Sequence, residues 1–387
     1  MILDHLVDPA FHASGEPHAV WRWMRENAPV HWHPPSELPG FWSLTRYDDI
    51  RQVYRDPLVF SSAHGVLLRP LRYGEDPGGG ATFALTDPPR HRELRSVVAD
   101  FFTERAVRDL HGFIEDSVEE LLDAALARGE FDFVHDVAAP LSMNVIGHIL
   151  GVPGEDHGDL LRWTDEVFEA GVSLVAHPEL MRYLVDLMDR RAADPRDDLV
   201  SALVLAMDKG LLTDEEILLN CENMIGASEN GRLALAGGVL ALMEHPHQWQ
   251  RLSRDRALLA TAVEEILRWT SSATHSMRRA TRSCTVGGER IEAGDWVVLW
   301  VPSGNRDERI FTEPDRFDVG RTPNRHLALG SGEHFCLGAR LARSQMQLVL
   351  SHVLDSASAI RAAGAPVRAA SIAVAGPARL PMRATLR

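Results

Sequence analysis

The pattern of hydrophobic and polar positions divides the chain into a long helical centre with shorter segments of strand on either side. Between residues 87 and 270, apolar residues recur at the three- and four-residue spacing of a helix face. The pattern breaks at residues 151–154 and before Pro178 and Pro246, where glycine and proline are expected to end helices. Residues 213–245 form an unbroken run, which predicts one long helix opened by a capping box.

Strands are predicted towards the two ends of the chain. Residues 40–62 alternate apolar and polar positions and then change to a helical period, which predicts a strand followed by a helix. Residues 284–301 indicate short strands with a glycine turn, and residues 371–387 predict a closing hairpin. Residues 62–82 are rich in glycine and proline and predict a long loop, a type of segment that is often functional. The expected fold class is mainly α with small β-sheets.

Composition narrows the classes of protein further. The 387 residues are 45% hydrophobic and 25% charged, as in a soluble globular protein. The net charge of −15, without a basic tract, makes a nucleic-acid partner unlikely on electrostatic grounds. No apolar stretch is long enough to span a bilayer, and the first residues lack the features of a signal peptide. Three cysteines argue against a disulfide framework and favour a reducing compartment, so we expect a cytoplasmic protein without membrane contact.

One cysteine lies in a distinctive setting. Residues 329–338 read LGSGEHFCLG, so that Cys336 follows glycines that permit tight turns and close approach of a flat group. A helical pattern begins at Leu337, which would place the thiol at a helix N-terminus, where the thiolate is favoured. A lone buried thiolate of this kind suits haem iron.

This run resembles the haem-binding signature of the cytochrome P450 family, whose usual form is Phe-Gly-x-Gly-x-His/Arg-x-Cys-x-Gly. Leu329 replaces the usual phenylalanine, a departure that concerns redox tuning. The resemblance extends from about Gly40 to Pro381 and implies a single domain, residues 1–387, with the cytochrome P450 fold. It also implies haem b (iron protoporphyrin IX), with Cys336 as the iron ligand and Gly338 beside the cofactor.

Four basic side chains are candidates to hold the haem propionates. His91 and Arg95 are four residues apart and therefore share one helical face, where they could grip a carboxylate. In the family, a His-x-x-x-Arg pair at this place binds the propionates. The resemblance implies Arg278 as a third ligand and His334 as a fourth, although Arg279 could take the place of its neighbour Arg278.

A second family motif concerns stability. Glu265 and Arg268 resemble the Glu-x-x-Arg pair of the family, and Arg316 is expected to complete an ion-pair triad. Because breaking a buried pair is costly, Glu265→Ala is expected to fail to assemble with haem.

The long predicted helix carries the candidate oxygen site. The small residues Gly226 and Ala227 would leave room for cofactor and oxygen, and Glu229 fits the family's acid position. Asn230 stands where a proton-handling threonine is usual. An amide orients water but relays protons poorly, so three options arise: Asn230 holds a relaying water, the substrate supplies a hydroxyl or amine, or the reaction is not simple hydroxylation. Asn230 could also merely hydrogen-bond to a neighbouring helix.

The same helix face suggests substrate contacts. Glu222 lies at i−4 from Gly226 and i−7 from Glu229, so its carboxylate could meet a cationic group, such as an amine, on the substrate. Alternatively, Glu222 lies where the helix approaches solvent. Ile225, Gly226, Thr274 and His275 are further candidates from the resemblance, as are the segments 62–82, 167–178, 274–277 and 374–377. His275 could instead be a solvent-facing loop residue.

Taken together, the resemblance implies a haem-thiolate monooxygenase of the soluble bacterial type, a monomer that oxidises a small organic molecule. Hydroxylation in natural-product tailoring is the expected reaction, with electrons from a ferredoxin or flavodoxin. Arg340 and Arg343 are candidates for a basic patch that receives such a donor, or ordinary solvated charges. The alternatives are a peroxide-using enzyme, a coupling or dealkylating enzyme and, more remotely, a haem gas sensor. Comparing turnover with peroxide against turnover with NAD(P)H and redox proteins separates the peroxide-using enzyme from the monooxygenase.

Overall fold

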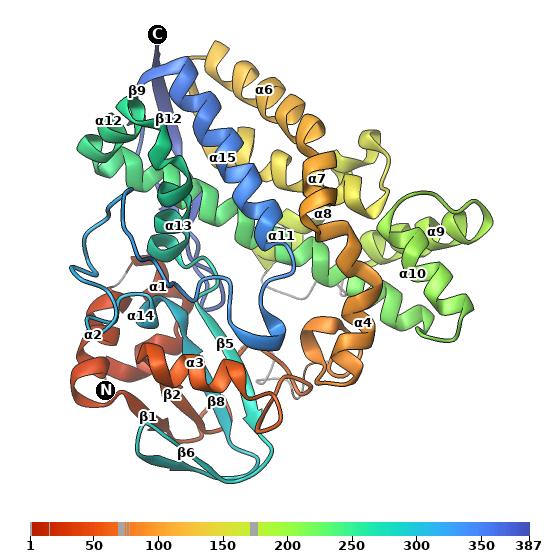
Figure 1. Ribbon diagram of the computed structural model, residues 1–387, viewed down its shortest axis with the longest axis vertical. Coiled ribbons are helices and arrows are strands. Elements are labelled where there is room, and N and C mark those ends of the chain that lie inside the picture. The colour runs from red at the N-terminus through yellow and green to blue at the C-terminus, as the bar shows by residue number, and fades with distance from the viewer. Residues whose placement is uncertain (1, 15, 69–73, 75, 77, 171–176) are drawn as a thin grey trace.

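The structure is a computed structural model that describes residues 2–14, 16–68, 74, 76, 78–170 and 177–387. As predicted, it is mainly helical with small sheets (Figure 1). The α-helices of the described chain are α1 (Pro9–Ser14), α2 (Pro17–Asn27), α3 (Tyr47–Arg55), α4 (Arg90–Val98), α5 (Glu104–Asp109), α6 (His111–Ala127), α7 (Ala139–Leu150), α8 (His157–Ala170), α9 (Pro178–Ala193), α10 (Leu199–Asp208), α11 (Asp214–Glu244), α12 (Pro246–Arg254), α13 (Leu259–Thr270), α14 (Val301–Gly304) and α15 (Ala339–Ser356).

The strands of the described chain form one larger sheet and three small ones. The larger sheet has the order β1 (Val30–His33), β2 (Phe41–Leu44), β8 (Trp296–Trp300), β5 (His275–Ala280) and β3 (Phe60–Ser61). The small sheets are β4 (Glu130–Asp132) with β12 (Pro381–Leu386) and β9 (Ala357–Ala362), β10 (Val367–Arg368) with β11 (Pro377–Arg379), and β6 (Cys284–Val286) with β7 (Glu289–Ile291).

The larger sheet brings distant parts of the chain together. β2 pairs in parallel with β8, and β5 lies antiparallel to β8, so the N-terminal strands meet strands from residues 275–300. All five residues of β8 are buried, as expected of a central strand rich in aliphatic and aromatic residues. In Figure 1 this sheet occupies the lower part of the molecule, while α9 and α10 lie at the far side of the helical part. The sheet therefore gives β5 a fixed position and a fixed direction for its side chains.

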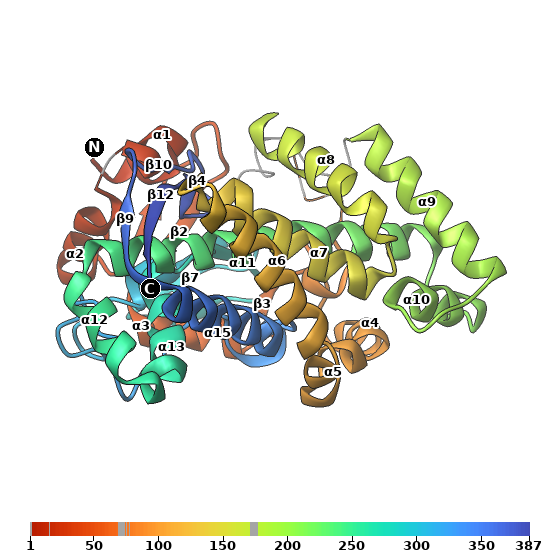
Figure 2. The same cartoon turned by 90° about the horizontal axis from the view of Figure 1, so that it is seen from above.

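Helix α11 is the centre of the helical part. Its N-terminus has the predicted capping box: the Thr213 side chain accepts from the Glu216 N–H, and the Glu216 carboxylate accepts from the Thr213 N–H. The helix ends at Glu244, directly before the predicted break at Pro246. Figure 2 shows α11 running through the middle of the molecule, and α7 and α13 pack against it. None of the helices in the described chain combines the length and the apolar character needed to cross a lipid bilayer.

The predicted closing hairpin at residues 371–387 is wrong. Its two strands exist, but they belong to different sheets: β11 pairs with β10, and β12 pairs with β9 on one side and β4 on the other. The strand partner of β12 at residues 130–132 is about 250 positions away in sequence, a separation that local turn signals do not report.

The Glu265 carboxylate is the centre of a buried polar cluster. Arg268 donates to both of its oxygens, over 2.7 and 2.8 Å, and neither side chain is exposed. Arg321 donates from Nε over 3.0 Å, and the Asn324 amide over 3.1 Å. The backbone N–H of Asp318 donates over 2.9 Å. The carboxylate is therefore surrounded by donors, which is what a buried charge requires.

Arg316 is not the third member of this cluster, contrary to the sequence prediction. Its side chain is exposed and pairs with Glu313 over 2.9 Å. Only its carbonyl oxygen takes part, accepting from Arg268 and Arg321. The sequence motif therefore identified the correct loop but the wrong arginine. The turn at residues 318–321 directs Arg321, and not Arg316, towards Glu265.

Glu265→Ala is expected to lower the free energy of unfolding by about 3–5 kcal/mol, because it leaves Arg268 buried without its carboxylate. Glu104→Ala removes a carboxylate from an exposed helical pair with Arg108, and should cost less than about 1 kcal/mol. Urea unfolding followed by circular dichroism measures both values, and the yield of haem-bound protein should fall only for the first variant. A loss at Glu265 no larger than the loss at Glu104 would contradict this account.

Candidate functional site

The backbone of the cysteine loop has a conformation that two of its positions can adopt only as glycine. Gly330 and Gly332 have φ of 72° and 75°, and a Cβ on Gly332 would lie 2.6 Å from the Tyr54 carbonyl oxygen. The backbone N–H of Cys336 donates to the Leu329 carbonyl over 2.9 Å. The two glycines thus allow the loop to turn tightly beneath α3 and present Cys336 just before α15.

The Cys336 thiol does not ionise readily in the protein alone. Burial raises its pKa, and this effect exceeds the opposing influence of the Gly338 N–H, Arg95 and Arg343. Burial therefore outweighs the expected stabilisation of the thiolate by the helix N-terminus. That N-terminus is also not directly at the thiol, since α15 begins only at Ala339. A coordinating metal ion deprotonates such a thiol outright, so metal binding would supply the charge stabilisation that the protein alone does not provide.

Basic side chains from three elements gather beside this loop. The rings of His91 on α4 and His334 in the loop lie 4.2 Å apart between centroids. Burial and, after it, the charges of Arg278, His91 and Arg95 lower the pKa of His334 to about 3. Burial likewise lowers the pKa of Arg278. The positive charges that disfavour protonation of His334 would stabilise a negatively charged group placed beside them.

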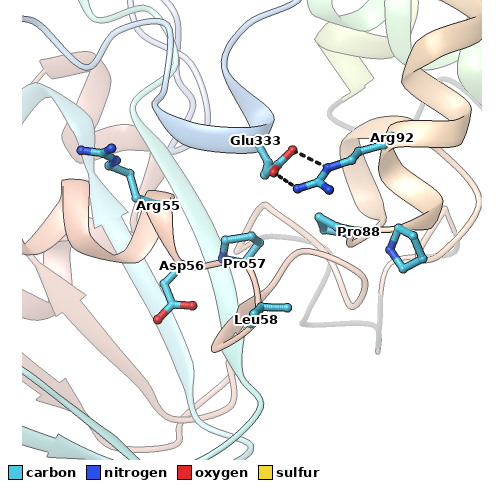
Figure 3. A pocket seen from close by; sticks show the side chains of 8 residues that line it. Arg55, Asp56, Pro57, Leu58, Pro88, Arg92 and Glu333 are labelled. Atoms are coloured by element: carbon cyan, nitrogen blue, oxygen red, sulfur yellow. Dashed lines mark hydrogen bonds and ion pairs between the residues drawn. The ribbon is translucent and has the colours of Figure 1, made fainter.

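Arg95 also secures the cysteine loop itself. Its Nη2 donates to the Phe335 carbonyl oxygen over 2.7 Å, and its Nη1 to the Glu333 carbonyl oxygen over 3.4 Å. The neighbouring Arg92 forms an ion pair with the Glu333 carboxylate (Figure 3). Helix α4 is therefore tied to the loop before Cys336 at two successive turns. Beside this contact lies a cleft of about 530 Å³, lined also by residues 55–58 and by Pro88 and Pro89.

The structure distinguishes Arg278 from Arg279. The two are neighbours on β5, so their side chains point to opposite faces of the sheet. Arg278 is buried, lies 5.5 Å from the Tyr54 ring and acts electrostatically on His334. Arg279 instead lies 5.3 Å from the Trp296 ring. Of the two, Arg278 is the one that joins the basic cluster.

Two features of this region fit a haem group. Both ring nitrogens of His91 are buried and have no hydrogen-bond partner among the described residues, although buried polar atoms are nearly always paired. A Cβ built on Gly338 would meet no atom of the described chain within 4 Å, so open space lies directly in front of the loop. The unpartnered donor suits a propionate, the open space suits a flat macrocycle, and the cysteine sulfur suits an iron ion.

Helix α11 supplies a buried acid. The Glu229 side chain is 4% exposed, and the Arg232 Nη2 lies 2.6 Å from its Oε2. Arg232 also donates from Nη1 to Asp165 on α8 over 2.7 Å. Burial raises the pKa of Glu229 to about 7, despite the nearby arginine. The side-chain oxygen of Asn230, the next residue, is buried and has no partner within the described ranges.

Glu222 is a second carboxyl with a raised pKa. Burial raises its pKa to about 7, and the negative charge of Asp76 in the predicted loop contributes in the same direction. Glu222 remains partly accessible, as do Gly226 and the exposed Ala227 along the same helix. The carboxyl of Glu222 is therefore largely removed from solvent and lies within electrostatic range of Asp76.

Three predicted substrate contacts are not accessible. Ile225 has no exposed surface and packs in the main hydrophobic core. Thr274 donates to the Ile372 carbonyl oxygen and is fully buried. The ring of His275 bonds to the Ile372 carbonyl over 2.8 Å and accepts from the Leu68 N–H over 3.0 Å, so it is neither a pocket residue nor a solvent-facing one. Burial lowers its pKa to about 4, as befits a neutral structural histidine.

Two other segments predicted to line the cavity extend beyond the described residues. Residues 69–73, 75 and 77 of the predicted loop and residues 171–176 lie outside the described residues. Sequence reasoning missed Arg232 and Asp165. The position of Arg232, three residues after Glu229, would have identified it as a partner on the same face. No local signal connects Asp165 with α11.

The chain is similar to known proteins of one family. The sequence model of the family Cytochrome P450 matches residues 176–358. Cytochrome P450 NovI from Streptomyces niveus is 38% identical over 355 residues, which cover 89% of this chain and 87% of NovI. Cyclomarin C epoxidase CymV from Salinispora arenicola is 39% identical over 376 residues, which cover 93% of this chain and 94% of CymV. The crystal structure of P450 OxyD, involved in the biosynthesis of vancomycin-type antibiotics, has a TM-score of 0.90 at 33% identity, covering 99% of each chain.

The fold and the site thus define a haem-dependent monooxygenase. The chain belongs to the cytochrome P450 family. Its cofactor is haem.

The separation of Arg278 from Arg279 predicts that only the first holds haem. Arg278→Ala should release haem roughly tenfold faster, since a charge-assisted hydrogen bond contributes about 1.5–3 kcal/mol. Arg279→Ala is the matched control, because it removes the same charge from the adjacent position and should release haem at the unaltered rate. Transfer of haem to excess apomyoglobin measures both rates. Faster release from the Arg279 variant than from the Arg278 variant would reverse the assignment.

Proposed function

We propose that this chain oxidises a small organic molecule in natural-product tailoring, most simply by hydroxylation, with Cys336 as the iron ligand. The observation that carries the proposal is the position of Cys336 on a tight loop beside an unneutralised basic cluster. Relatives named for antibiotic biosynthesis and for epoxidation support the tailoring assignment. They do not favour a peroxide-using, coupling or dealkylating enzyme or a gas sensor.

In this proposal the basic cluster holds the cofactor by its propionates. His91 donates from a ring nitrogen that has no partner among the described residues, and Arg278 contributes the buried charge. His334 lies beside them, with its Nε2 3.3 Å from the Ser62 hydroxyl oxygen. Arg95 reaches the same cluster while it holds the loop. Gly338 leaves space in front of the sulfur. Haem, when bound, supplies the dioxygen chemistry, and a thiolate ligand favours O–O cleavage.

Gly226 and Ala227 leave accessible helix surface where cofactor and oxygen need room. The acid and the amide that follow would handle protons and water. Glu229 has a pKa near neutrality, so it can both hold and release a proton at physiological pH. The unpartnered oxygen of Asn230 is suited to accept from a water molecule, which would carry the proton that the amide itself cannot relay.

The substrate in this proposal carries an amine or several polar groups. Glu222 is partly buried without an arginine or lysine to neutralise it in the described structure, and Asp76 adds negative charge. An ammonium group would satisfy both carboxylates. An uncharged substrate would leave Glu222 protonated instead, since burial disfavours the anion.

Electrons would reach the haem from a separate ferredoxin or flavodoxin. Arg340 is exposed close behind the cysteine loop and remains available for an acidic donor. Arg343 is less available, because Glu264 accepts two bonds from it, over 2.6 and 2.9 Å. The proposal is of a monomer acting in the cytoplasm, supported by three free cysteines, which suit a reducing compartment.

A test of the haem–thiolate assignment is the spectrum of the reduced, carbon monoxide-treated protein. The wild type should show the Soret band at the wavelength for which the family is named, and Cys336→His should lose that band while retaining haem. The proposal also expects turnover with NAD(P)H and redox proteins to exceed turnover with hydrogen peroxide. A normal band in the Cys336 variant would remove the ligand assignment.

For the substrate, Glu222→Gln should weaken binding of amine-bearing ligands roughly tenfold or more, since it removes a charge-assisted contact. In the wild type, affinity for such ligands should rise as pH increases through about 7, because Glu222 then becomes anionic. The shift of the haem absorption band on titration reports binding. Glu215→Gln, at the exposed start of α11, is the control variant, and the des-amino analogue is the control ligand. Equal weakening of both ligands would refute an ammonium contact.

A further inference from the structure

The Glu264 carboxylate joins the two segments of chain on either side of the cysteine loop. Glu264 lies on α13, which packs beside α15 (Figure 1). Arg343 of α15, seven residues after Cys336, donates to Oε1 over 2.6 Å and to Oε2 over 2.9 Å. His326, ten residues before Cys336, lies with its Nε2 3.1 Å from Oε2. One side chain therefore holds both the segment that enters the loop and the segment that leaves it.

The hydrogen bonds of His326 fix the orientation of its ring. Its Nδ1 accepts from the Ala328 N–H over 3.3 Å, so we assign the ring proton to Nε2, which donates to Glu264. The side chain is 3% exposed, so the contact is shielded from water. Ala328 directly precedes Leu329, whose carbonyl oxygen accepts from the Cys336 N–H. The contact with Glu264 is therefore close to the backbone that positions the cysteine.

The charge of Arg343 acts on the cysteine sulfur. Burial raises the pKa of the Cys336 thiol, and the positive charges of Arg95 and Arg343 act in the opposite direction. Arg95 donates to backbone carbonyl oxygens of the loop, whereas Arg343 grips the Glu264 carboxylate with two bonds. Burial opposes the ionisation of Glu264, but its bonds with Arg343 and His326 outweigh burial and hold its pKa at about 2. Glu264 is thus an anion at neutral pH, and its pair with Arg343 has no net charge.

We propose that Glu264 is a positioning residue for the Cys336 ligand: it holds the cysteine loop at both ends and offsets the charge of Arg343, and so keeps the reduction potential of the bound haem low. The inference rests on the proposed function, in which Cys336 ligates the iron. Glu264 acts through Arg343 and His326 and does not need to touch the cofactor.

The physical argument concerns the charge that reduction adds. One electron from the redox partner enters the site without a proton, so the site gains one negative charge. A net positive charge nearby stabilises the reduced state and raises the potential, and a net negative charge lowers it. The intact pair of Glu264 and Arg343 contributes neither. Removal of the carboxylate leaves the arginine unbalanced, and removal of the guanidinium leaves the carboxylate unbalanced, so the two changes act in opposite directions.

The test is a spectroelectrochemical titration of the haem-bound protein at constant pH, without a redox partner. Glu264→Gln should raise the reduction potential and Arg343→Gln should lower it. Each shift should correspond to about a tenfold change in the equilibrium constant, or about 59 mV for one electron. The double variant should return to nearly the wild-type value, and Glu264→Asp, which keeps the charge, should do the same.

Asp355→Asn is the matched control. It removes a carboxylate from another arginine pair of α15, in which Asp355 lies 2.6 Å from Arg256. The position is near the other end of α15, about 24 Å from its first residue at the rise of a helix, so the potential should not change.

A second measurement separates the hold on the loop from the charge. His326→Ala removes a bond to Glu264 but leaves the pair with Arg343, so it should keep the potential and lose the carbon monoxide band faster in dilute urea. Glu264→Gln should change both quantities.

Opposite shifts in potential are the result that a merely structural role would not produce. Shifts of Glu264→Gln and Arg343→Gln in the same direction, or no shift in either, overturn the proposal. If Glu264→Gln does not retain haem, an unchanged or raised potential in Arg343→Gln overturns it. Absence of the carbon monoxide band in the wild type would instead show that the proposed function had failed.

Discussion

The structure depends most on an electrostatic imbalance beside the cysteine loop. His91, Arg278 and His334 are brought together from a helix, a strand and a loop, and burial lowers the pKa of each. Such an arrangement is unfavourable in the protein alone and becomes favourable when an anionic group enters. Because a ligand that binds only the folded state stabilises it, the cofactor and the fold support each other. The same reasoning applies to the thiol of Cys336, whose pKa burial raises and which a coordinating metal ion would deprotonate in the proposed function.

Two arginine–carboxylate clusters in this chain illustrate how surroundings determine function. Glu265 accepts from Arg268, Arg321, an amide and a backbone N–H, so its charge is fully satisfied and its position is fixed. Glu229 has one arginine, which it shares with Asp165. Both carboxylates are almost completely buried, yet the first serves as a fixed structural centre and the second as a group that can change its charge. The number of donors, rather than the depth of burial, separates the two roles.

Features encoded by neighbouring residues could be predicted from the sequence. The capping box of α11, the breaks before Pro178 and Pro246, and the glycines around Cys336 all act over a few positions. Features that require distant segments could not. The partner of β12, the choice of Arg321 over Arg316, and the burial of Thr274 and His275 under residues 68 and 372 depend on how separate elements meet. For Arg278, the alternation of a strand was predictable, but which face would be buried was not.

Helix α11 carries two carboxyls with similar pKa values and different neighbours. Glu229 faces an arginine within the protein, so its charge can be balanced internally and its proton can be exchanged without a ligand. Asp76, another acid, acts on Glu222, and no arginine or lysine of the described residues does, so a cation that enters the protein could balance the charge of Glu222. A buried carboxyl next to a second carboxyl is stable when one of them is protonated or when a cation lies between them. The difference in neighbours therefore fits the roles proposed for these residues, proton handling for Glu229 and recognition of a cationic or hydrogen-bonding substrate for Glu222. The two residues lie two turns apart on one helix.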